Sequence, residues 1–304
     1  MLTASGEEVL PTGTDGTPPR GHGTPPRAVG ATRAWLRLLG SEAGLTFRRP
    51  RNLAILGVLA LVPVLIGLAL RLFGAPDENE GAPPILAQVT GNGLFLTFTA
   101  LSVLVQLMLP VAVTVVAGDS VAGEAGAGTL RYLLAAPAGR TRLLIVKYVN
   151  AAVFCLAAVT VVALSGLLAG LVLFPVGPIT LLSGGTIPLL EGVLRIGLVV
   201  LYVTAGMAAL AAVALAISTL TEVAVGAIAS TVVLVIAAQV LGVIPQLSGL
   251  QPYLLTHWWS GFDGVLRDPV DFGDMGQGLL VFAAYIAIFG SVAWARFTSK
   301  DITC

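Results

Sequence analysis

Six long apolar runs constrain the fold of this chain more than any other feature of its sequence. Each run is flanked by charged or turn residues and is long enough to cross a bilayer, which requires about 20 apolar residues per helix. Of the 304 residues, 56% are hydrophobic and 11% are charged, whereas soluble domains are roughly 45–50% apolar. We therefore predict an integral membrane protein. The expected spans are 53–73, 94–116, 148–174, 192–217, 223–244 and 278–294.

The pattern of these runs predicts an all-α fold. A membrane β-barrel would show segments of about ten residues with alternating polarity, and the runs do not alternate. Pro63 and Pro110 fall inside the first and second expected spans, where each removes a backbone donor and permits a kink. The third and fourth runs are longer than one span requires, so we expect those helices to tilt or to extend beyond the bilayer.

Two segments precede the first span. Residues 1–30 are rich in Gly, Pro and Thr and too poor in apolar residues to repay the entropy of ordering, which predicts a disordered cytoplasmic tail. Residues 31–49 combine an imperfect apolar stripe with four arginines, which favours an amphipathic helix in the membrane interface. A soluble helical turn before the first span is the alternative. The six-span domain then occupies 50–301.

The basic residues indicate the orientation. Most of the 16 Lys and Arg residues lie before the first span, between the second and third, or after the sixth, and the other connections carry mainly acids. Because positive loops stay cytoplasmic, we expect both termini in the cytoplasm. Arg outnumbers Lys 14 to 2, and Ala and Gly abound, which suggests a GC-rich bacterial genome and an inner or plasma membrane location. The basic residues border spans without interleaved aromatics, so we expect no nucleic-acid binding.

The sequence offers little enzymatic chemistry. GEAGAGTLR, from Gly123, has the glycine spacing of a phosphate loop, but Thr129 and Leu130 follow Gly128 where the lysine and hydroxyl of such a loop belong. The preceding apolar run is also too long for a strand. The two His and two Cys residues are distant in sequence, so the chain lacks the residues that a metal site or a Cys/His catalytic site requires. We expect no enzymatic activity, cofactor or metal in this chain itself.

The longest cytoplasmic connection between spans, within 117–147, is the most informative stretch. Leu130, Leu133 and Leu134 fall on one face of a short helix that Pro137 ends. Such a helix suits docking in a partner's groove and equally suits a lipid-facing position pinned by arginines. Another short connection, 219–222, has the Thr-x-x-Glu spacing of a capping box for the fifth span.

A family resemblance rests on the order and spacing of residues in the longer connection. These residues are Asp119, Glu124, Gly128, Thr129, Leu130, Leu133, Leu134, Pro137, Arg140 and Lys147. The pattern resembles the signature of ABC-2-type permeases, the membrane subunits of ATP-binding-cassette exporters. Six spans, the interfacial helix, an aromatic re-entrant extracellular segment between spans five and six, and the ending RFTSKDI extend the resemblance over roughly 31–301. Ala125 and Val146 depart from the family's frequent basic residue and glycine.

The resemblance implies the permease subunit of an ABC exporter. Its translocation pathway would form in a homodimer, or in a heterodimer with a similar permease, at an interface lined by spans one, two and five. ATP and Mg would bind to two copies of a separate ATPase subunit. Residues 124–134 would form the coupling helix in that subunit's cleft, with Asp119, Arg140 and Lys147 also contributing to the coupling. Thr219 and Glu222 would make a second, smaller contact.

Polar residues inside the spans leave alternatives. Gln106 and Gln239 are candidates for a pathway that carries hydrophobic or amphipathic cargo, although hydrogen bonds across helices are the favoured interpretation. Arg195, four residues after Glu191, is the one ionisable candidate near a span end. A secondary transporter or channel without an ATPase would predict more such charges or matching interrupted helices. A non-transporting membrane scaffold needs only a partner-binding loop.

Overall fold

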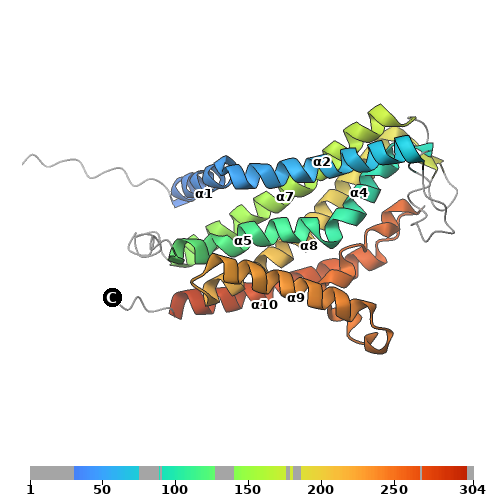
Figure 1. Ribbon diagram of the computed structural model, residues 1–304. Coiled ribbons are helices and arrows are strands. Elements are labelled where there is room, and N and C mark those ends of the chain that lie inside the picture. Colours follow the sequence, from blue (N-terminus) through green and yellow to red (C-terminus); the bar gives the residue numbers. More distant parts are fainter. Residues whose placement is uncertain are drawn as a thin grey trace, which may run out of the picture.

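The fold is a bundle of helices that run along one common direction (Figure 1). The computed structural model describes residues 31–74, 89, 91–126, 140–175, 179–180, 186–267 and 269–299. Within these ranges, six helices are long and apolar enough to cross a membrane. This confirms the coarse prediction of a helical protein with several helices of membrane-spanning length and hydropathy. The predicted tail over 1–30 lies outside the described residues.

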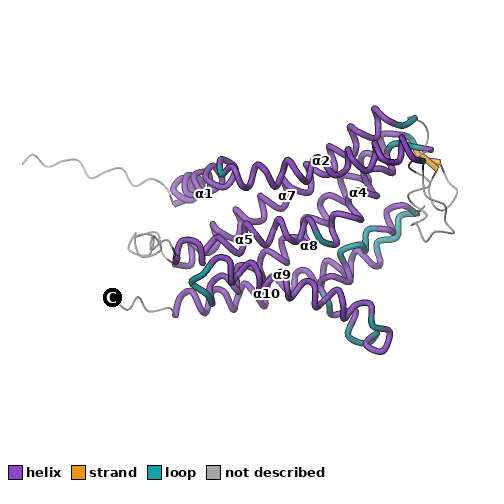
Figure 2. The backbone as a smooth tube through the Cα atoms, viewed as in Figure 1, coloured by secondary structure: helices purple, strands orange, loops and turns teal. Residues whose placement is uncertain are grey.

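Helices account for nearly all of the described secondary structure (Figure 2). The α-helices are α1 (Ala31–Arg48), α2 (Pro50–Phe73), α4 (Leu94–Gln106), α5 (Met108–Gly126), α7 (Arg140–Leu173), α8 (Leu189–Leu220), α9 (Ala224–Val243) and α10 (Gly273–Ser299). Short 3-10 helices η2 (Pro245–Leu247), η3 (Gln251–Tyr253), η4 (Leu255–Trp258) and η5 (Asp263–Leu266) join α9 to α10. Strands β1 (Ile179–Thr180) and β2 (Thr186–Ile187) pair antiparallel.

The two ends of the bundle differ in charge. The start of α2, the end of α5, the start of α7 and the end of α10 lie at one end, together with α1 (Figure 1). We call this the basic end, because the described parts of these elements carry most of the described arginines and the lysine. The opposite end, the far end, holds β1, β2 and the 3-10 helices. The basic residues expected on one side of the membrane thus gather at one end; which side of a membrane that end faces stays a prediction.

Helix α8 is the centre of the bundle. It contacts α5, α7, α9 and α10, and it is the most buried of the six membrane-length helices. Its stretch 205–216 consists largely of alanine, and small side chains let neighbouring helices approach closely. A Cβ atom at Gly206 would lie about 3 Å from the rings of Phe282 and Trp259. Because Gly206 has no side chain, α10 and the segment after α9 can pack closely against α8.

Two glycines set the contact between α4 and α7. A Cβ atom at Gly93 would overlap the carbonyl of Gly170, and one at Gly170 would overlap the carbonyl of Gly93. One turn away, a Cβ atom at Gly166 would lie 3.1 Å from the Cα of Thr97. This is the small-residue packing that membrane helices use, because dispersion contacts replace the hydrophobic effect inside the bilayer.

The second predicted span is broken into α4 and α5 at Leu107. Pro110 has no N–H for the carbonyl of Gln106, and its ring clashes with that carbonyl in a regular helix. The side-chain amide of Gln239, on α9, donates a hydrogen bond to the Gln106 carbonyl instead. The expected kink is therefore a break, and α9 supplies the donor that the proline lacks. Pro63, by contrast, lies inside the continuous helix α2.

Several helices are longer than the sequence predicted at the basic end. Helix α5 continues to Gly126 and α7 begins at Arg140, so the connection expected over 117–147 is helical at both of its ends. A span predicted from an apolar run ends at the first charged residues, whereas the helix itself continues as long as tertiary contacts stabilise it. Asp119 and Glu124 consequently lie on α5, and Lys147 lies on α7.

The segment between α9 and α10 packs onto the far end. Its side chains Trp258, Trp259 and Phe262 are buried. The Tyr202 hydroxyl, on α8, donates to the carbonyl of Trp258 at 2.6 Å. These contacts hold the segment, here called the lid, against α8 as far as Gly206, about halfway along that helix. Its depth in a membrane, and with it the predicted re-entrant position, stays a prediction.

Arg195 fixes this lid to α8. Its Nη1 donates to the carbonyls of Val265 and Arg267 at 2.7 and 2.8 Å, and its Nη2 pairs with Glu191 at 2.7 Å. The side chain is buried, and a buried charge needs such partners. The ionisable residue noted near the end of the fourth span therefore has a structural role.

Candidate functional site

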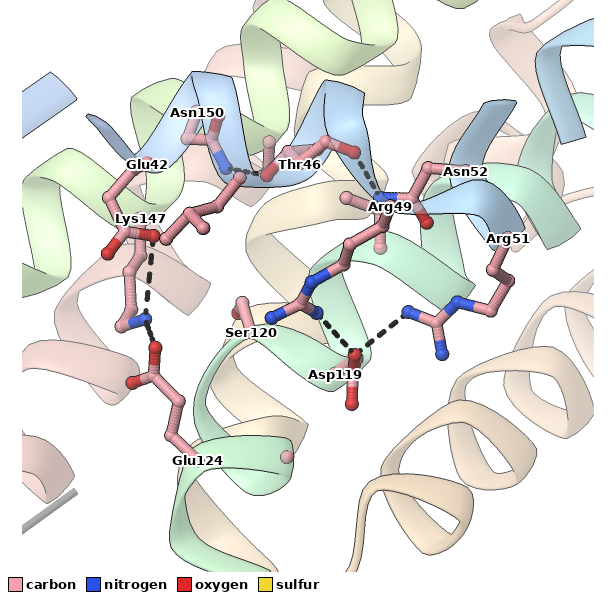
Figure 3. Close-up of a pocket in the computed structure, with 14 residues that line it drawn as sticks. Glu42, Thr46, Arg49, Arg51, Asn52, Asp119, Ser120, Glu124, Lys147 and Asn150 are labelled. Atoms are coloured by element: carbon pink, nitrogen blue, oxygen red, sulfur yellow. Dashed lines mark hydrogen bonds and ion pairs between the residues drawn. The ribbon is translucent and has the colours of Figure 1, made fainter. Parts of the chain in front are cut away.

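A polar pocket opens at the basic end between α1, α2, α5 and α7 (Figure 3). Its volume is about 330 Å³. Six charged side chains line it, three of each sign: Glu42, Arg49, Arg51, Asp119, Glu124 and Lys147. This charge density distinguishes the pocket from the apolar helix faces around it.

Asp119 holds the two arginines at the start of α2. Arg49 Nη1 lies 3.1 Å and Arg51 Nη2 lies 2.8 Å from the same oxygen, Asp119 Oδ2 (Figure 3). The arginine side chains are about half exposed, at 55% and 47%. Two guanidinium groups share one carboxylate, so a net positive charge remains at this point. The sequence predicted a coupling role for Asp119, and the structure places it against α2.

Lys147 lies between two carboxylates. Its Nζ is 2.5 Å from Glu124 Oε1 and 3.9 Å from Glu42 Oε2, and its side chain is only 2% exposed (Figure 3). These contacts join α1, α5 and α7 through one buried cation. The sequence assigned Glu124 and Lys147 to contacts with an ATPase subunit. Within the chain, the two side chains pair with each other, and their contact with an ATPase subunit stays a prediction.

A small amide network seats α1 on the bundle. Asn150 Nδ2 donates to Thr46 Oγ1 at 2.7 Å, and Asn52 Nδ2 donates to the Thr46 carbonyl at 2.9 Å. All three residues are buried. Phe47 adds an aromatic contact with Phe154, their ring centroids 6.1 Å apart. The helix expected at the membrane interface is thus attached to both α2 and α7.

Ser218 connects the last turns of α5 to the end of α8. Its hydroxyl donates to the carbonyl of Gly118 at 2.7 Å and accepts from the backbone N–H groups of Val121 and Ala122 at 3.2 and 2.9 Å. In a regular helix the Ala122 N–H would bond to the Gly118 carbonyl, so the hydroxyl is inserted into the helical ladder. Ser218 is fully buried. No sequence pattern predicts this contact, because a serine in the middle of a helix has no distinctive spacing.

The turn between α8 and α9 packs beside the end of α5. A Cβ atom at Gly126 would lie 3.1 Å from the carbonyl of Glu222. The predicted capping box is wrong: Thr219 lies inside α8, where its hydroxyl donates to the carbonyl of Ala216. The N-cap of α9 is Val223, without a side-chain cap, and the Thr221 hydroxyl accepts from the Val223 N–H. The end of α8 extends three residues beyond the predicted span and carries Thr219 into the helix.

Of the remaining candidates in the coupling loop, the structure describes Arg140. Gly128, Thr129, Leu130, Leu133 and Leu134 lie outside the described residues. Arg140 begins α7, and its Nη1 donates to the carbonyl of Thr298 near the end of α10.

An apolar groove between α2 and α5 adjoins the polar pocket. Its volume is about 540 Å³. Nearly all of its lining is apolar, from Ala54, Ile55, Val58 and Leu59 of α2, Leu107, and Met108, Val111, Ala112 and Val115 of α5. Arg51 is the one charged residue in this lining, and it also lines the polar pocket. In the sequence, Arg51 is simply one of the basic residues before the first span, and only the pairing of α2 with α5 reveals the groove.

The described residues contain no group of three or more His, Cys, Asp or Glu side chains suited to a metal ion. The polar pocket has carboxylates, but each of the three faces a cation at salt-bridge distance. Its arrangement suits the binding of a charged or zwitterionic group and the mechanical connection of helices.

Comparison with protein families identifies a match for most of the chain. Residues 85–303 match a family model described as a protein of unknown function, DUF2705. The matched region begins before α4 and includes every described helix from α4 to α10. No curated protein matches the chain significantly.

Proposed function

The chain belongs to the DUF2705 family, and we propose that it is the permease subunit of an ABC exporter that works as a dimer with two copies of a separate ATPase. The observation that carries the proposal is the junction at the basic end, where the end of α5 and the turn between α8 and α9 are held together. The predicted coupling helix, 124–134, begins within the last turn of α5, and the predicted second contact is that turn between α8 and α9. One rigid unit would therefore receive both contacts with an ATPase.

The junction supplies a path for motion. Ser218 ties α5 to the central helix α8, and Lys147 ties α5 to α1 and α7. When two ATPases close on ATP, the loops after α5 would be drawn together, and packed helices would pass the displacement on as rigid bodies. Because α8 contacts four other long helices, the displacement would reach the far end.

The exposed faces of α2, α5 and α9 suit a pathway between two copies. Leu61, Leu65 and Leu68 of α2, and Val233 and Val240 of α9, are among the exposed large apolar side chains. The contact of Gln239, on α9, with the Gln106 carbonyl at the end of α4 is exposed. Hydrophobic or amphipathic cargo would meet this polar point in an otherwise apolar wall.

The interruptions of the helices favour this proposal over a secondary transporter. Such transporters usually carry broken helices at corresponding positions in two halves. Among the described spans the break at Leu107 has no counterpart, since α2, α7, α8, α9 and α10 are each continuous.

The proposal is tested by the ATPase activity of the complex purified through a tag on this chain. Leu220 and Val223 are exposed apolar residues at the turn between α8 and α9. Carboxylates at both positions, in the variant L220D/V223D, should lower the co-purified, vanadate-sensitive activity at least tenfold without preventing membrane insertion. V243D is the matched control, because Val243 is as exposed but lies at the other end of α9. Equal activity in wild type and L220D/V223D would refute the docking of an ATPase at this turn.

A further inference from the structure

We propose that the chain binds an anionic phospholipid at the basic end, with the phosphate on Arg49 and Arg51 and an acyl chain in the apolar groove between α2 and α5. This inference is independent of the proposed transport function, because the site is complete within one chain. It concerns a lipid of the surrounding membrane.

The arginine pair provides the headgroup site. Arg49 and Arg51 both contact Asp119 Oδ2, which fixes the two guanidinium groups near each other and leaves most of their N–H donors for another acceptor. Arg48, which is also exposed, precedes them. Asp119 balances one positive charge of the three. A phosphate diester has the charge and the acceptor geometry that arginine forks bind best.

The groove begins at the same arginine. Arg51 lines both the polar pocket and the groove, so the headgroup site and the apolar channel are continuous. From Arg51 toward the middle of the bundle, the groove is lined by apolar side chains of α2 and α5. Several of them are exposed, including Val58 and Val111. A charged mouth on an apolar channel is complementary to an amphipathic molecule with an anionic head.

The length of the groove fits one leaflet. From Arg51 to Leu59, α2 rises about 12 Å at 1.5 Å per residue, and the lining residues of α5 cover the same length from Val115 back to Leu107. One leaflet contributes about 15 Å of the bilayer's hydrocarbon core. The groove ends at the break between α4 and α5, where the backbone changes direction at Leu107. An acyl chain would thus enter at the headgroup level and end near the middle of the bilayer.

Native mass spectrometry of the full-length protein tests the site. The protein is purified in detergent, stripped of lipid and titrated with dioleoyl phosphatidylglycerol or dioleoyl phosphatidylcholine. We expect phosphatidylglycerol to bind at least tenfold more tightly, because only its headgroup has a net negative charge. The variant R49Q/R51Q should lower its binding about tenfold. R71Q, which removes an exposed arginine at the other end of α2, should bind like wild type.

A second variant tests the groove without touching the ion pairs. A54F places a ring below Arg51 and should lower phosphatidylglycerol binding, whereas A69F, at an exposed position of α2 outside the groove, should not. Wild-type binding by A54F, or equal binding of the two lipids to wild type, overturns the proposal. If A54F instead changes the oligomeric mass while lipid binding is unaltered, a second copy fills the groove and the proposal is equally overturned.

Discussion

The buried ion pair between Lys147 and Glu124 gives the sharpest prediction for stability. Replacing Lys147 by Met removes the charge and keeps a side chain of similar length. Glu124 then loses its contact at 2.5 Å, and Glu42 loses the cation that lies 3.9 Å away. Two partly buried carboxylates face each other across the space that Lys147 Nζ occupied. We expect K147M to destabilise the protein, and the double variant K147M/E124Q to recover part of the loss.

The structure sets the size of the effect. At an effective dielectric constant of about 20, two charges 2.5 Å apart attract by roughly 6–7 kcal/mol. Most of this is offset by the desolvation of Lys147, whose side chain is 2% exposed. Breaking a buried pair from one side typically costs about 3–5 kcal/mol. Glu124 is 22% exposed and Glu42 is 17% exposed, so water partly stabilises the two carboxylates after the loss of the lysine. We therefore expect about 3 kcal/mol for K147M.

Reversible unfolding by dodecyl sulfate in mixed micelles, followed by tryptophan fluorescence, measures this change. R296M is the control, because Arg296 is exposed at the same end of the bundle, and it should change the free energy of unfolding by less than about 0.5 kcal/mol. The double variant should be more stable than K147M, since it removes the negative charge of one of the two partly buried carboxylates that lose Lys147. If the effects of K147M and E124Q simply add, the two residues are not coupled and the reasoning fails.

Three further substitutions test the helix contacts. G170A should destabilise the protein by at least about 2 kcal/mol, because its Cβ overlaps the carbonyl of Gly93; G197A, with open space around the position, is the control, and equal unfolding curves for the two would contradict the close contact. S218A should cost about 1–2 kcal/mol through the lost bridge between α5 and α8, and amide hydrogen exchange should increase at Val121 and Ala122; unchanged exchange there would refute the inserted hydroxyl. Q239L should cost about 1 kcal/mol, because the carbonyl freed by the proline loses its donor, and restoring an N–H by P110A should remove the difference; a persistent difference would argue against this origin.

Much of the fold follows from hydropathy alone. Five of the six apolar runs coincide with membrane-length helices, whereas the second run is divided between α4 and the first part of α5. A bilayer leaves few alternatives to a helix of about 20 apolar residues. The boundaries follow less well. Hydropathy cannot show that α5 continues to Gly126, because that continuation depends on Ser218 and on the contact with Lys147. The break at Leu107 is predictable in kind from Pro110, but its position three residues earlier reflects the carbonyl that the proline ring displaces.

The candidate site, too, could be predicted from the sequence only in part. Asp119, Glu124 and Lys147 are apparent in the sequence because of their spacing. Their partners are not: Arg49 and Arg51 lie about 70 positions before Asp119, and only the packing of α2 beside α5 brings them to the same oxygen. The capping box at Thr219 shows the opposite error. The motif has the right spacing but forms no cap, because α8 continues through Thr219. The Thr219 hydroxyl donates a hydrogen bond to a carbonyl of its own helix.

The mass of the intact complex tests the central claim most directly. The tagged chain is purified from its native membrane in mild detergent, and the assembly is weighed and its subunits identified by mass spectrometry. The proposed function predicts two permease chains together with two copies of an ATPase that has both a phosphate loop and an ABC signature. An assembly that keeps its oligomeric state through purification yet contains no such ATPase would contradict the claim and leave a transporter without ATPase, or a scaffold, in its place.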